Sequence, residues 1–348
     1  MQAKEHIKPD AEEQAGLEAR VAFLRLPGSY PYPVGEVEVR ETHMSWVFLA
    51  GDWAYKLKKP VAYDYLDHRT LLSRQLNSEA EVRLNQVLAG DIYVGVVPLV
   101  MTKAGLLALE GRGEPVDWLV KMKRLPESGM LDYAIRRQCL DETALRRVAD
   151  LLASFYRVAT PVTLSLPQFA ARLESQIRTC QDQLAGPVFA LPAALLRELR
   201  AGQLAFLSSR PTQLESRVAA GRILEAHGDL RPEHICLGPR PAIIDRLEFS
   251  RELRIMDVAE ELAYLDLECE LLGNTHVGRV FEECYRAASG DPLPRPLLTF
   301  YKVKKACLRA YLVIRHILEP RYQGDPRWHQ RALAYLALAE KYHRECSR

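Results

Sequence analysis

The interpretation of this chain starts from the segment His227-Gly228-Asp229-Leu230-Arg231-Pro232-Glu233-His234-Ile235-Cys236-Leu237, which is followed by Ala242-Ile243-Ile244-Asp245. A polar turn precedes two short apolar runs, and Gly-Pro-Arg-Pro separates the runs, so the pattern predicts a β-hairpin. Three side chains able to bind a metal or a proton, Asp229, His234 and Asp245, then lie at the ends of paired strands. Functional side chains commonly occupy loops on such a rigid scaffold.

The bulk composition is that of an ordinary globular protein. The chain has 348 residues, of which 48% are hydrophobic and 26% charged, which allows two domains or one large domain with two lobes. A formal net charge of +2 argues against a dedicated nucleic-acid-binding protein. An acidic small molecule needs only a local basic cleft. We therefore expect a small-molecule partner and no nucleic acid; the composition says nothing about the oligomeric state.

The cysteines and the N-terminal residues indicate a compartment. The seven cysteines are scattered without a C-x-x-C pair, which indicates free thiols in a reducing environment, most of them small core residues. The first residues contain no apolar segment typical of a secretory signal, and no run approaches the ~20 apolar residues of a membrane helix. We expect a cytoplasmic protein that does not insert into a membrane.

The first 125 residues are predicted to form a domain of antiparallel strands with an inserted helix. Alternating and β-rich patterns predict strands at residues 36–40, 45–49, 53–58, 93–100 and 118–122. The turn at residues 50–52 joins two of these strands into a hairpin. Helical spacing predicts a helix from Leu71 to Ala89, and an earlier helix, capped by Asp10, that runs to Arg25.

The remaining residues, 126–348, are predicted to form a larger helical domain that holds the hairpin. Helical patterns occur at residues 142–157 (capped by Asp141), 166–219, 257–272, 277–289, 297–318 and 326–344. The predicted fold class is therefore α+β, with a small β-rich N-terminal lobe and a larger helical C-terminal lobe.

The polar residues of these patterns suit phosphoryl transfer. That reaction needs a carboxylate to orient the attacking hydroxyl, a second carboxylate to hold Mg²⁺, and a cation near the phosphates. Asp229, Asp245 and Lys56 fit these three roles. Lys56 and Lys58 share one face of their strand. In the alternative interpretation, both lysines are merely exposed to solvent on an edge strand.

These residues resemble the aminoglycoside phosphotransferase and choline-kinase-like superfamily, a branch of the protein-kinase-like fold. Its catalytic loop has the pattern H-G-D-x-x-x-x-N, and a metal-binding Asp follows on the next strand. The resemblance implies that Asp229 is the catalytic base, Asp245 the principal Mg²⁺ ligand and Lys56 the lysine of the third strand. The carboxylate partner of that lysine would be Glu81, with Glu79 as the alternative. The two point to different helix faces, so only one of them can reach the lysine.

The resemblance covers about residues 36 to 320 and implies two cofactors, ATP and Mg²⁺. ATP would lie between the lobes against residues 121–125. Residues 254–263 resemble the helix that follows the metal-binding strand. Residues 41–46 and 55–60 resemble a bacterial group whose members often carry a C-terminal P-loop kinase-like domain. No G-x-x-x-x-G-K-[ST] occurs here, so we expect no such fused domain.

The chain departs from the family pattern at three places. The family Asn, a second metal ligand, is His234 here; an imidazole can bind a metal, but Mg²⁺ prefers oxygen, so His234 either binds the metal or contacts Asp229 or substrate. The glycine-rich loop of protein kinases is missing, and Thr42 and Ser45, in the turn between the first two strands, are the candidates to donate to phosphate. Glu248 is a further candidate carboxylate near the metal.

Several other polar residues are expected to be structural. His227 is expected to tie the loop to backbone carbonyls, and Asp257 to cap the helix that follows it. Glu260 and Glu261 are expected to form a helix face with one buried pair. A basic group on a later helix is expected either to line a cleft for an acidic substrate or to form a solvated face; it consists of Lys302, Lys304, Lys305 and Arg309.

The predicted function is an ATP- and Mg²⁺-dependent phosphotransferase that acts on a hydroxyl of a small polar molecule. One alternative is a non-catalytic, kinase-like nucleotide-binding or interaction module, which His234 suggests. Another is a metal-dependent hydrolase built on His227, Asp229, His234 and Asp245, although no second H-x-H or H-E-x-x-H motif occurs. Fold-level analogy does not name the phosphate acceptor.

Overall fold

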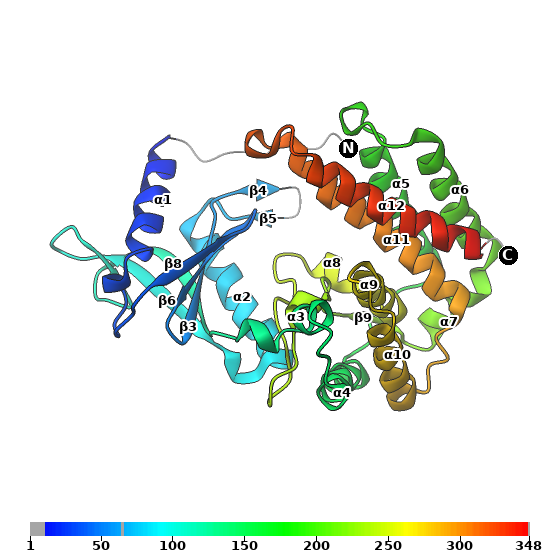
Figure 1. Cartoon of the computed structure of the whole chain (residues 1–348), viewed down its shortest axis with the longest axis horizontal. Coiled ribbons are helices and arrows are strands. Elements are labelled where there is room, and N and C mark those ends of the chain that lie inside the picture. The colour runs from blue at the N-terminus through cyan, green and yellow to red at the C-terminus, as the bar shows by residue number, and fades with distance from the viewer. Residues whose placement is uncertain (1–10, 64–65, 347–348) are drawn as a thin grey trace. The chain divides into compact units, whose positions relative to one another are not determined.

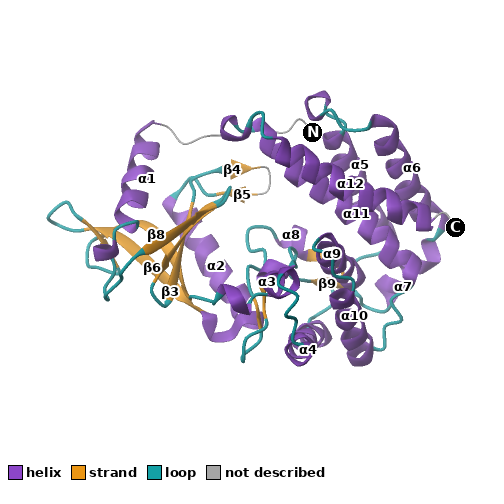
Figure 2. Cartoon of the chain, in the orientation of Figure 1, coloured by secondary structure: helices purple, strands orange, loops and turns teal. Residues whose placement is uncertain are grey.

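The computed structural model describes residues 11–63 and 66–346, and packing divides the chain into two compact units. The first unit comprises Met1–Gly129 and Arg240–Glu252, and the second comprises Met130–Pro239 and Leu253–Arg348. Strands gather in the first unit and helices in the second (Figure 2). The segment that carries Asp245 therefore packs with the first unit, while Asp229 belongs to the second. The domain boundary at residue 125 stays a prediction.

The first unit is built on one antiparallel sheet of six strands in the order β1-β2-β3-β8-β6-β7. These strands are β1 (Val37–Glu41), β2 (Ser45–Ala50), β3 (Trp53–Lys58), β6 (Tyr93–Met101), β7 (Leu107–Leu109) and β8 (Glu114–Lys123). A separate short pair consists of β4 (Ala62–Tyr63) and β5 (Leu66–Asp67). The β2–β3 hairpin is confirmed, and Gly51 adopts the left-handed φ of 58° that its turn needs.

The two faces of this sheet differ in chemistry because side chains alternate along a strand. Tyr55 and Leu57 of β3 are fully buried in a hydrophobic core. That core also takes Leu17 and Leu24 of helix α1 (Ala11–Leu24) (Figure 1). Asp10, the expected cap of this helix, lies outside the described residues.

The opposite face of β3 carries Lys56 and Lys58 toward helix α2 (Leu71–Ala89), whose bounds match the predicted helix. Thr70 caps α2 by accepting a hydrogen bond from the Ser73 backbone N–H. β3 is an interior strand between β2 and β8, and Lys58 is only 1% exposed. The interpretation of these lysines as solvent-exposed groups on an edge strand is therefore wrong.

The second unit is mainly helical, as predicted. Its helices are α3 (Leu131–Arg136), α4 (Glu142–Val158), α5 (Leu166–Leu184), α6 (Ala193–Ser209), α7 (Pro211–Ala219), α9 (Val258–Leu271), α10 (His276–Ser289), α11 (Arg295–Ile314) and α12 (Pro326–Cys346). A short helix, α8 (Arg251–Arg254), crosses the boundary between the units. Asp141 caps α4 by accepting from the backbone N–H groups of Thr143 and Ala144, as predicted. Residues of α5, α6, α9, α11 and α12 share one hydrophobic core.

A short strand pair positions the start of α9. β9 (Ile223–Glu225) pairs antiparallel with β12 (Ile255–Asp257). Asp257 ends β12 and caps α9, accepting from the Ala259 N–H at 2.9 Å, so the predicted cap is confirmed. Its carboxylate also binds the buried guanidinium of Arg217, at 2.6 and 2.9 Å. Two further short strands, β10 (Ile235–Cys236) and β11 (Ala242–Ile243), lie in the second and first units respectively.

The basic residues of α11 face acidic residues of α9 and not solvent. Glu260, which is 3% exposed, pairs with Lys304 at 2.7 Å and with Lys305 at 3.0 Å. Burial opposes the ionisation of Glu260, but the two lysines outweigh it and lower its pKa to about 2. Lys302 pairs with Asp266 and Arg309 with Glu268 in the same way. The solvated-face interpretation of the α11 group is therefore wrong, whereas the expected buried pair is present at Glu260.

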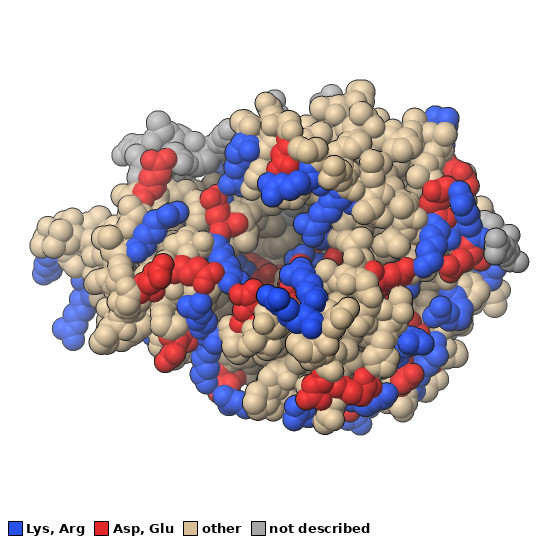
Figure 3. Space-filling model, in the orientation of Figure 1, with Lys and Arg blue, Asp and Glu red and all other residues tan. Residues whose placement is uncertain are grey.

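The surface and the cysteines agree with the composition. Acidic and basic side chains are mixed over the face of the molecule in Figure 3. Six cysteines carry free thiols, and all of these except Cys139 are buried; Cys346 is not among the side chains described. Among residues 11–63 and 66–346, no helix is both long enough and apolar enough to cross a membrane.

Candidate functional site

The first group of predicted site residues meets at Lys56 in the first unit. The Lys56 ammonium donates to Glu81 Oε1 and to Asp245 Oδ1, both at 2.8 Å. Lys56 and Glu81 are almost enclosed, whereas the Asp245 side chain is 43% exposed. Burial opposes protonation of Lys56, but Asp245 and Glu81 outweigh it and raise its pKa well above the usual value. Lys56 therefore stays protonated beside the solvent-accessible carboxylate of Asp245.

The alternative lysine partner, Glu79, does not contact Lys56. Glu79 is exposed on α2 and accepts a hydrogen bond from the Gln75 side chain at 3.0 Å. Two residues apart on a helix point to different faces, so only one of the two glutamates can face the sheet. The lysine partner in the structure is Glu81.

The backbone at Asp245 has an unusual conformation. Its φ of 62° lies in the left-handed region, which residues with a side chain rarely adopt and which recurs at functional sites. The Asp245 N–H donates to the Tyr93 hydroxyl at 3.1 Å, and the next N–H, that of Arg246, donates to Asn85 Oδ1 at 2.8 Å. These contacts stabilise the turn that directs the Asp245 carboxylate toward Lys56.

Lys58 extends this cluster in a way that the sequence analysis missed. Its ammonium donates to Glu81 Oε2 at 2.6 Å and also pairs with Glu248. Glu248, the further candidate carboxylate near the metal, has a side chain that is 8% exposed and contacts this lysine; its role near the metal stays a prediction. The available indication was the spacing of two on β3, which places Lys56 and Lys58 on the same face.

The expected phosphate donors Thr42 and Ser45 lie where the sequence placed them, around the β1–β2 turn. The Thr42 hydroxyl accepts from the N–H groups of Met44 and Ser45, at 3.3 and 3.0 Å. The two hydroxyls are 3.0 Å apart. Thr42 is exposed while Ser45 is 2% exposed, so the Thr42 hydroxyl is the more accessible of the pair.

Asp229, the predicted catalytic base, lies in the loop after β9 in the second unit. The Tyr264 hydroxyl donates to its Oδ1 at 2.9 Å, and the Arg231 guanidinium binds its Oδ2 at 3.0 Å. Burial opposes ionisation of Asp229, but the charges of Arg231 and Arg309 outweigh it and hold its pKa well below the usual range. Its side chain is 31% exposed, so an ionised carboxylate is open to a ligand.

The loop that carries Asp229 is held by Glu261 of α9. Glu261 accepts from the backbone N–H groups of His227 and Gly228, at 2.9 and 2.6 Å, and from the Tyr156 hydroxyl at 2.5 Å. Gly228 has a φ of 93°, a conformation that glycine adopts without strain. The buried His227 ring contributes from within the loop, because its Nδ1 accepts from the Asp229 N–H at 3.3 Å.

His234 is engaged within the same loop. Its Nδ1 lies 2.8 Å from the Asp229 carbonyl oxygen and its Nε2 lies 3.1 Å from Arg231 Nη2. A carbonyl oxygen only accepts, so Nδ1 carries the proton and Nε2 accepts from the guanidinium. Of the alternatives expected for His234, the structure shows the contact with Asp229. A role as metal ligand stays a prediction and would require the ring to leave these contacts.

The donor set can be tested against the expected Mg²⁺. Mg²⁺ is usually held by one or two carboxylates together with the phosphates of a substrate, and it prefers oxygen to nitrogen. The exposed carboxylate of Asp245 fits such a site, and the His234 imidazole fits it less well. In the described part of the chain, no group of three or more His, Cys, Asp or Glu side chains is arranged to hold a metal by itself.

Comparison with solved structures shows the same fold in small-molecule kinases. A choline/ethanolamine kinase family protein from Mesorhizobium loti aligns with a TM-score of 0.58 at 16% identity, over 95% of this chain and 96% of its own. Aminoglycoside 2'-phosphotransferase-IIIa, in a GDP complex, aligns with a TM-score of 0.52 at 16% identity, over 94% of this chain and 98% of its own. Choline kinase from Cryptosporidium parvum aligns with a TM-score of 0.53 at 9% identity, over 95% of this chain and 96% of its own. The chain therefore shares its fold with choline kinases and an aminoglycoside phosphotransferase. The predicted α+β, protein-kinase-like fold is confirmed.

The curated relatives are themselves uncharacterised. Proteins from Mycobacterium bovis and Mycobacterium tuberculosis are 30% identical over 315 residues, which is 88% of this chain and 59% of each relative. The chain thus spans about three-fifths of the length of the curated relatives it matches. No protein-family model matches the chain.

Within this kinase-like fold, α9 supplies more site residues than the sequence analysis named. Glu261, Tyr264 and Glu268 recur at steps of three and four and thus share one side of the helix. Tyr264 binds Asp229, and Glu268 binds Arg309 at 3.0 Å. The recurrence of these polar residues at steps of three and four was the available indication that they act on one side of α9.

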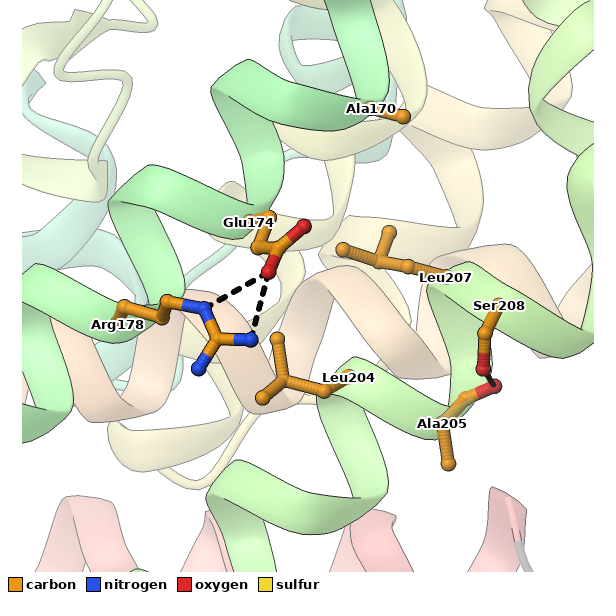
Figure 4. Close-up of a pocket in the computed structure, with 7 residues that line it drawn as sticks. All are labelled: Ala170, Glu174, Arg178, Leu204, Ala205, Leu207 and Ser208. Carbon is orange, nitrogen blue, oxygen red and sulfur yellow. Dashed lines mark hydrogen bonds and ion pairs between the residues drawn. The ribbon is translucent and has the colours of Figure 1, made fainter. Parts of the chain in front are cut away.

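One pocket lies apart from all of the predicted site residues. It occupies about 440 Å³ between α5 and α6, and Figure 4 shows Glu174 and Arg178 paired beside it. Its lining consists of Ala170, Glu174, Arg178, Leu204, Ala205, Leu207 and Ser208. The two charged residues of its lining, Glu174 and Arg178, pair with each other at 2.6 Å. The lining therefore offers no unpaired charge that would direct a ligand into the pocket.

Proposed function

We propose that the protein is an ATP- and Mg²⁺-dependent phosphotransferase that acts on a hydroxyl group of a small polar molecule. The observation that carries the proposal is the contact of Lys56 with both Glu81 and the exposed Asp245 carboxylate. A fixed cation next to an accessible carboxylate suits the phosphates of a nucleotide and their metal ion. The neighbours in fold support it, since they are small-molecule kinases and phosphotransferases, one of them crystallised with GDP.

In this proposal the Lys56 cluster binds the nucleotide. Lys56 stays protonated at neutral pH because its two carboxylate partners raise its pKa, and it contacts the phosphates while Glu81 holds it in place. Asp245 holds Mg²⁺, which when bound neutralises charge on the phosphate oxygens. The exposed Thr42 hydroxyl donates to a phosphate, and Ser45 orients it through their 3.0 Å contact.

Asp229 receives the hydroxyl of the acceptor molecule. The Asp229 carboxylate is ionised at neutral pH, so it accepts a hydrogen bond from that hydroxyl and takes its proton as the phosphoryl group is transferred. A carboxylate with a lowered pKa is a weak base, so orientation of the hydroxyl is its larger contribution. Tyr264 and Arg231 fix the carboxylate for this task.

The test measures turnover of both ATP and GTP with a library of small hydroxyl compounds, in the native protein and in Asp229→Asn. We expect a phosphorylated product from the native protein and about 10²–10⁴-fold slower turnover from the variant, because a positioned acid–base group contributes about that factor. Nucleotide affinity should be retained in Asp229→Asn. A native protein that binds nucleotide but gives no product with any acceptor, like its variant, would favour the non-catalytic module.

A further inference from the structure

A second lysine of β3 shares the carboxylate of Glu81 with Lys56. Glu81 Oε1 accepts from Lys56 at 2.8 Å, and Oε2 accepts from Lys58 at 2.6 Å. One ammonium on each oxygen fixes the plane of the carboxylate, because a rotation breaks at least one of the two charged hydrogen bonds. The proposed function uses Lys56 only, so the task of Lys58 is unassigned.

The other partner of Lys58 is Glu248, which follows Asp245 by three residues in the same segment. The side chains of Lys58 and Glu248 are 2% and 8% exposed. Burial opposes protonation of Lys58, but Glu248 and Glu81 keep its pKa above the usual value, and the pair stays ionised. Charges therefore alternate from Asp245 through Lys56, Glu81 and Lys58 to Glu248.

Two neutral side chains hold the start of the segment to which Glu248 belongs. Tyr93 accepts from the Asp245 N–H at 3.1 Å, and Asn85 contacts Arg246 at both its N–H and its carbonyl, at 2.8 and 3.3 Å. Glu248 is bound through its contact with Lys58. Contacts at residues 245, 246 and 248 thus fix the left-handed turn at Asp245 and the chain that follows it.

Stability alone does not account for the Lys58–Glu248 pair. Replacing a buried ion pair by apolar residues of similar volume is often neutral or stabilising, because two charges no longer need to leave water. The pair also adds no net charge to the cluster, so its complete removal leaves the sum of charges around Lys56 unchanged. What it contributes is the position of the groups it binds.

We propose that Lys58 and Glu248 are positioning residues of the nucleotide site. Lys58 fixes Glu81 against Lys56, and through Glu248 it fixes the segment that presents Asp245. When Lys56 turns toward a phosphate, Lys58 keeps Glu81 in place. As a statement about nucleotide and Mg²⁺ this rests on the proposed function, whereas the geometry can be tested on the protein alone.

The test is the double variant Lys58→Met/Glu248→Leu, which removes both charges and keeps similar volumes. We expect a melting temperature close to or below that of the native protein, because removal of the pair itself is nearly neutral while Glu81 Oε2 loses its 2.6 Å donor. Hydrogen exchange of the amides at residues 245–248 should be at least tenfold faster. The ratio of nucleotide affinity in Mg²⁺ to that in EDTA should fall at least tenfold. If the double variant does not fold, Glu248→Gln, which removes one charge and keeps the shape, is compared in the same way.

The matched control is Arg74→Met, which breaks another buried ion pair of α2, that with Asp117 at 2.8 Å. We expect a lower melting temperature, with exchange at residues 245–248 and the affinity ratio both at native values. Native exchange at residues 245–248 in the double variant would overturn the positioning role. Faster exchange there, in a protein whose native form binds no nucleotide, would overturn the proposed function and leave the positioning of the segment in place.

Discussion

Removing the Glu261 carboxylate should loosen the loop that carries Asp229. Glu261→Ala leaves three hydrogen-bond donors without their acceptor: the N–H groups of His227 and Gly228 and the Tyr156 hydroxyl, now at 2.9, 2.6 and 2.5 Å. Each buried donor left unsatisfied costs about 1–3 kcal/mol, and water can partly replace a carboxylate in the space it leaves. We expect the free energy of unfolding to fall by about 4 kcal/mol, in the lower part of the range of about 3–9 kcal/mol that three such donors give, because water replaces part of the lost acceptor.

The assay is urea unfolding of the native protein, of Glu261→Ala and of two controls. Glu261→Gln keeps a carbonyl oxygen for the backbone donors, so its free energy of unfolding should fall by less than half as much as that of Glu261→Ala. Glu283→Ala removes a glutamate of α10 that is 59% exposed and lies 3.4 Å from Arg146, and it should lose less than about 0.5 kcal/mol. Nucleotide affinity should change less than threefold in Glu261→Ala, because Lys56 and its partners lie in the other unit. A Glu261→Ala protein within about 1 kcal/mol of native would refute the assignment of the loop's anchor to Glu261.

Three further changes have expected outcomes. Glu260→Gln should lower the free energy of unfolding by about 3 kcal/mol at neutral pH, which is the value of lowering the Glu260 pKa from 4.5 to about 2. This stabilisation is present above pH 4.5 and disappears as the pH falls through 2. Equal pH slopes of stability in the native protein and the variant between these values would contradict it. Burial, with the charge of Lys58, lowers the His68 pKa from 6.5 to about 3. As the pH is lowered from 6.5 to 3, His68 is protonated in the unfolded chain but not in the native protein, so the free energy of unfolding should fall by up to about 5 kcal/mol. Denaturant unfolding of His68→Gln should show a flatter pH slope, and an unchanged slope would assign that acid sensitivity to other groups. Tyr264→Phe removes the 2.9 Å hydrogen bond to Asp229 and should slow phosphoryl transfer about tenfold at unchanged nucleotide affinity, whereas an equal loss in both would indicate a general loss of structure.

Local patterns predicted the elements of the fold well, because each depends on neighbouring residues. The β2–β3 hairpin follows from alternation and from its Gly51 turn, and Leu71–Ala89 follows from helical spacing and a Thr70 cap. The resemblance supplied the pairing of Lys56 with Glu81, which no local pattern contains. The choice against Glu79 needed the structure, because it depends on which side of α2 meets the sheet.

The burial of charged groups could not be predicted, because it depends on helices that meet only after folding. The basic residues of α11 have the sequence pattern of a solvated face, yet Lys304 and Lys305 pair with Glu260 of α9, more than forty residues earlier. The same holds for the Tyr264 hydroxyl on Asp229 and for Glu248 beside Lys58. Each of these contacts joins residues from different elements, and a single sequence does not specify which elements are neighbours.

The measurement that tests the central claim most directly is a calorimetric titration of ATP and of GTP, with Mg²⁺ and with EDTA, into the native protein and Lys56→Met. We predict binding of at least one nucleotide that requires Mg²⁺ in the native protein. Lys56→Met should bind about ten- to a hundredfold more weakly, because it loses a hydrogen bond from a charged group worth about 1.5–3 kcal/mol. A folded native protein that binds neither nucleotide in the presence of Mg²⁺, or a Lys56→Met protein that binds as tightly as native, would contradict the proposed function.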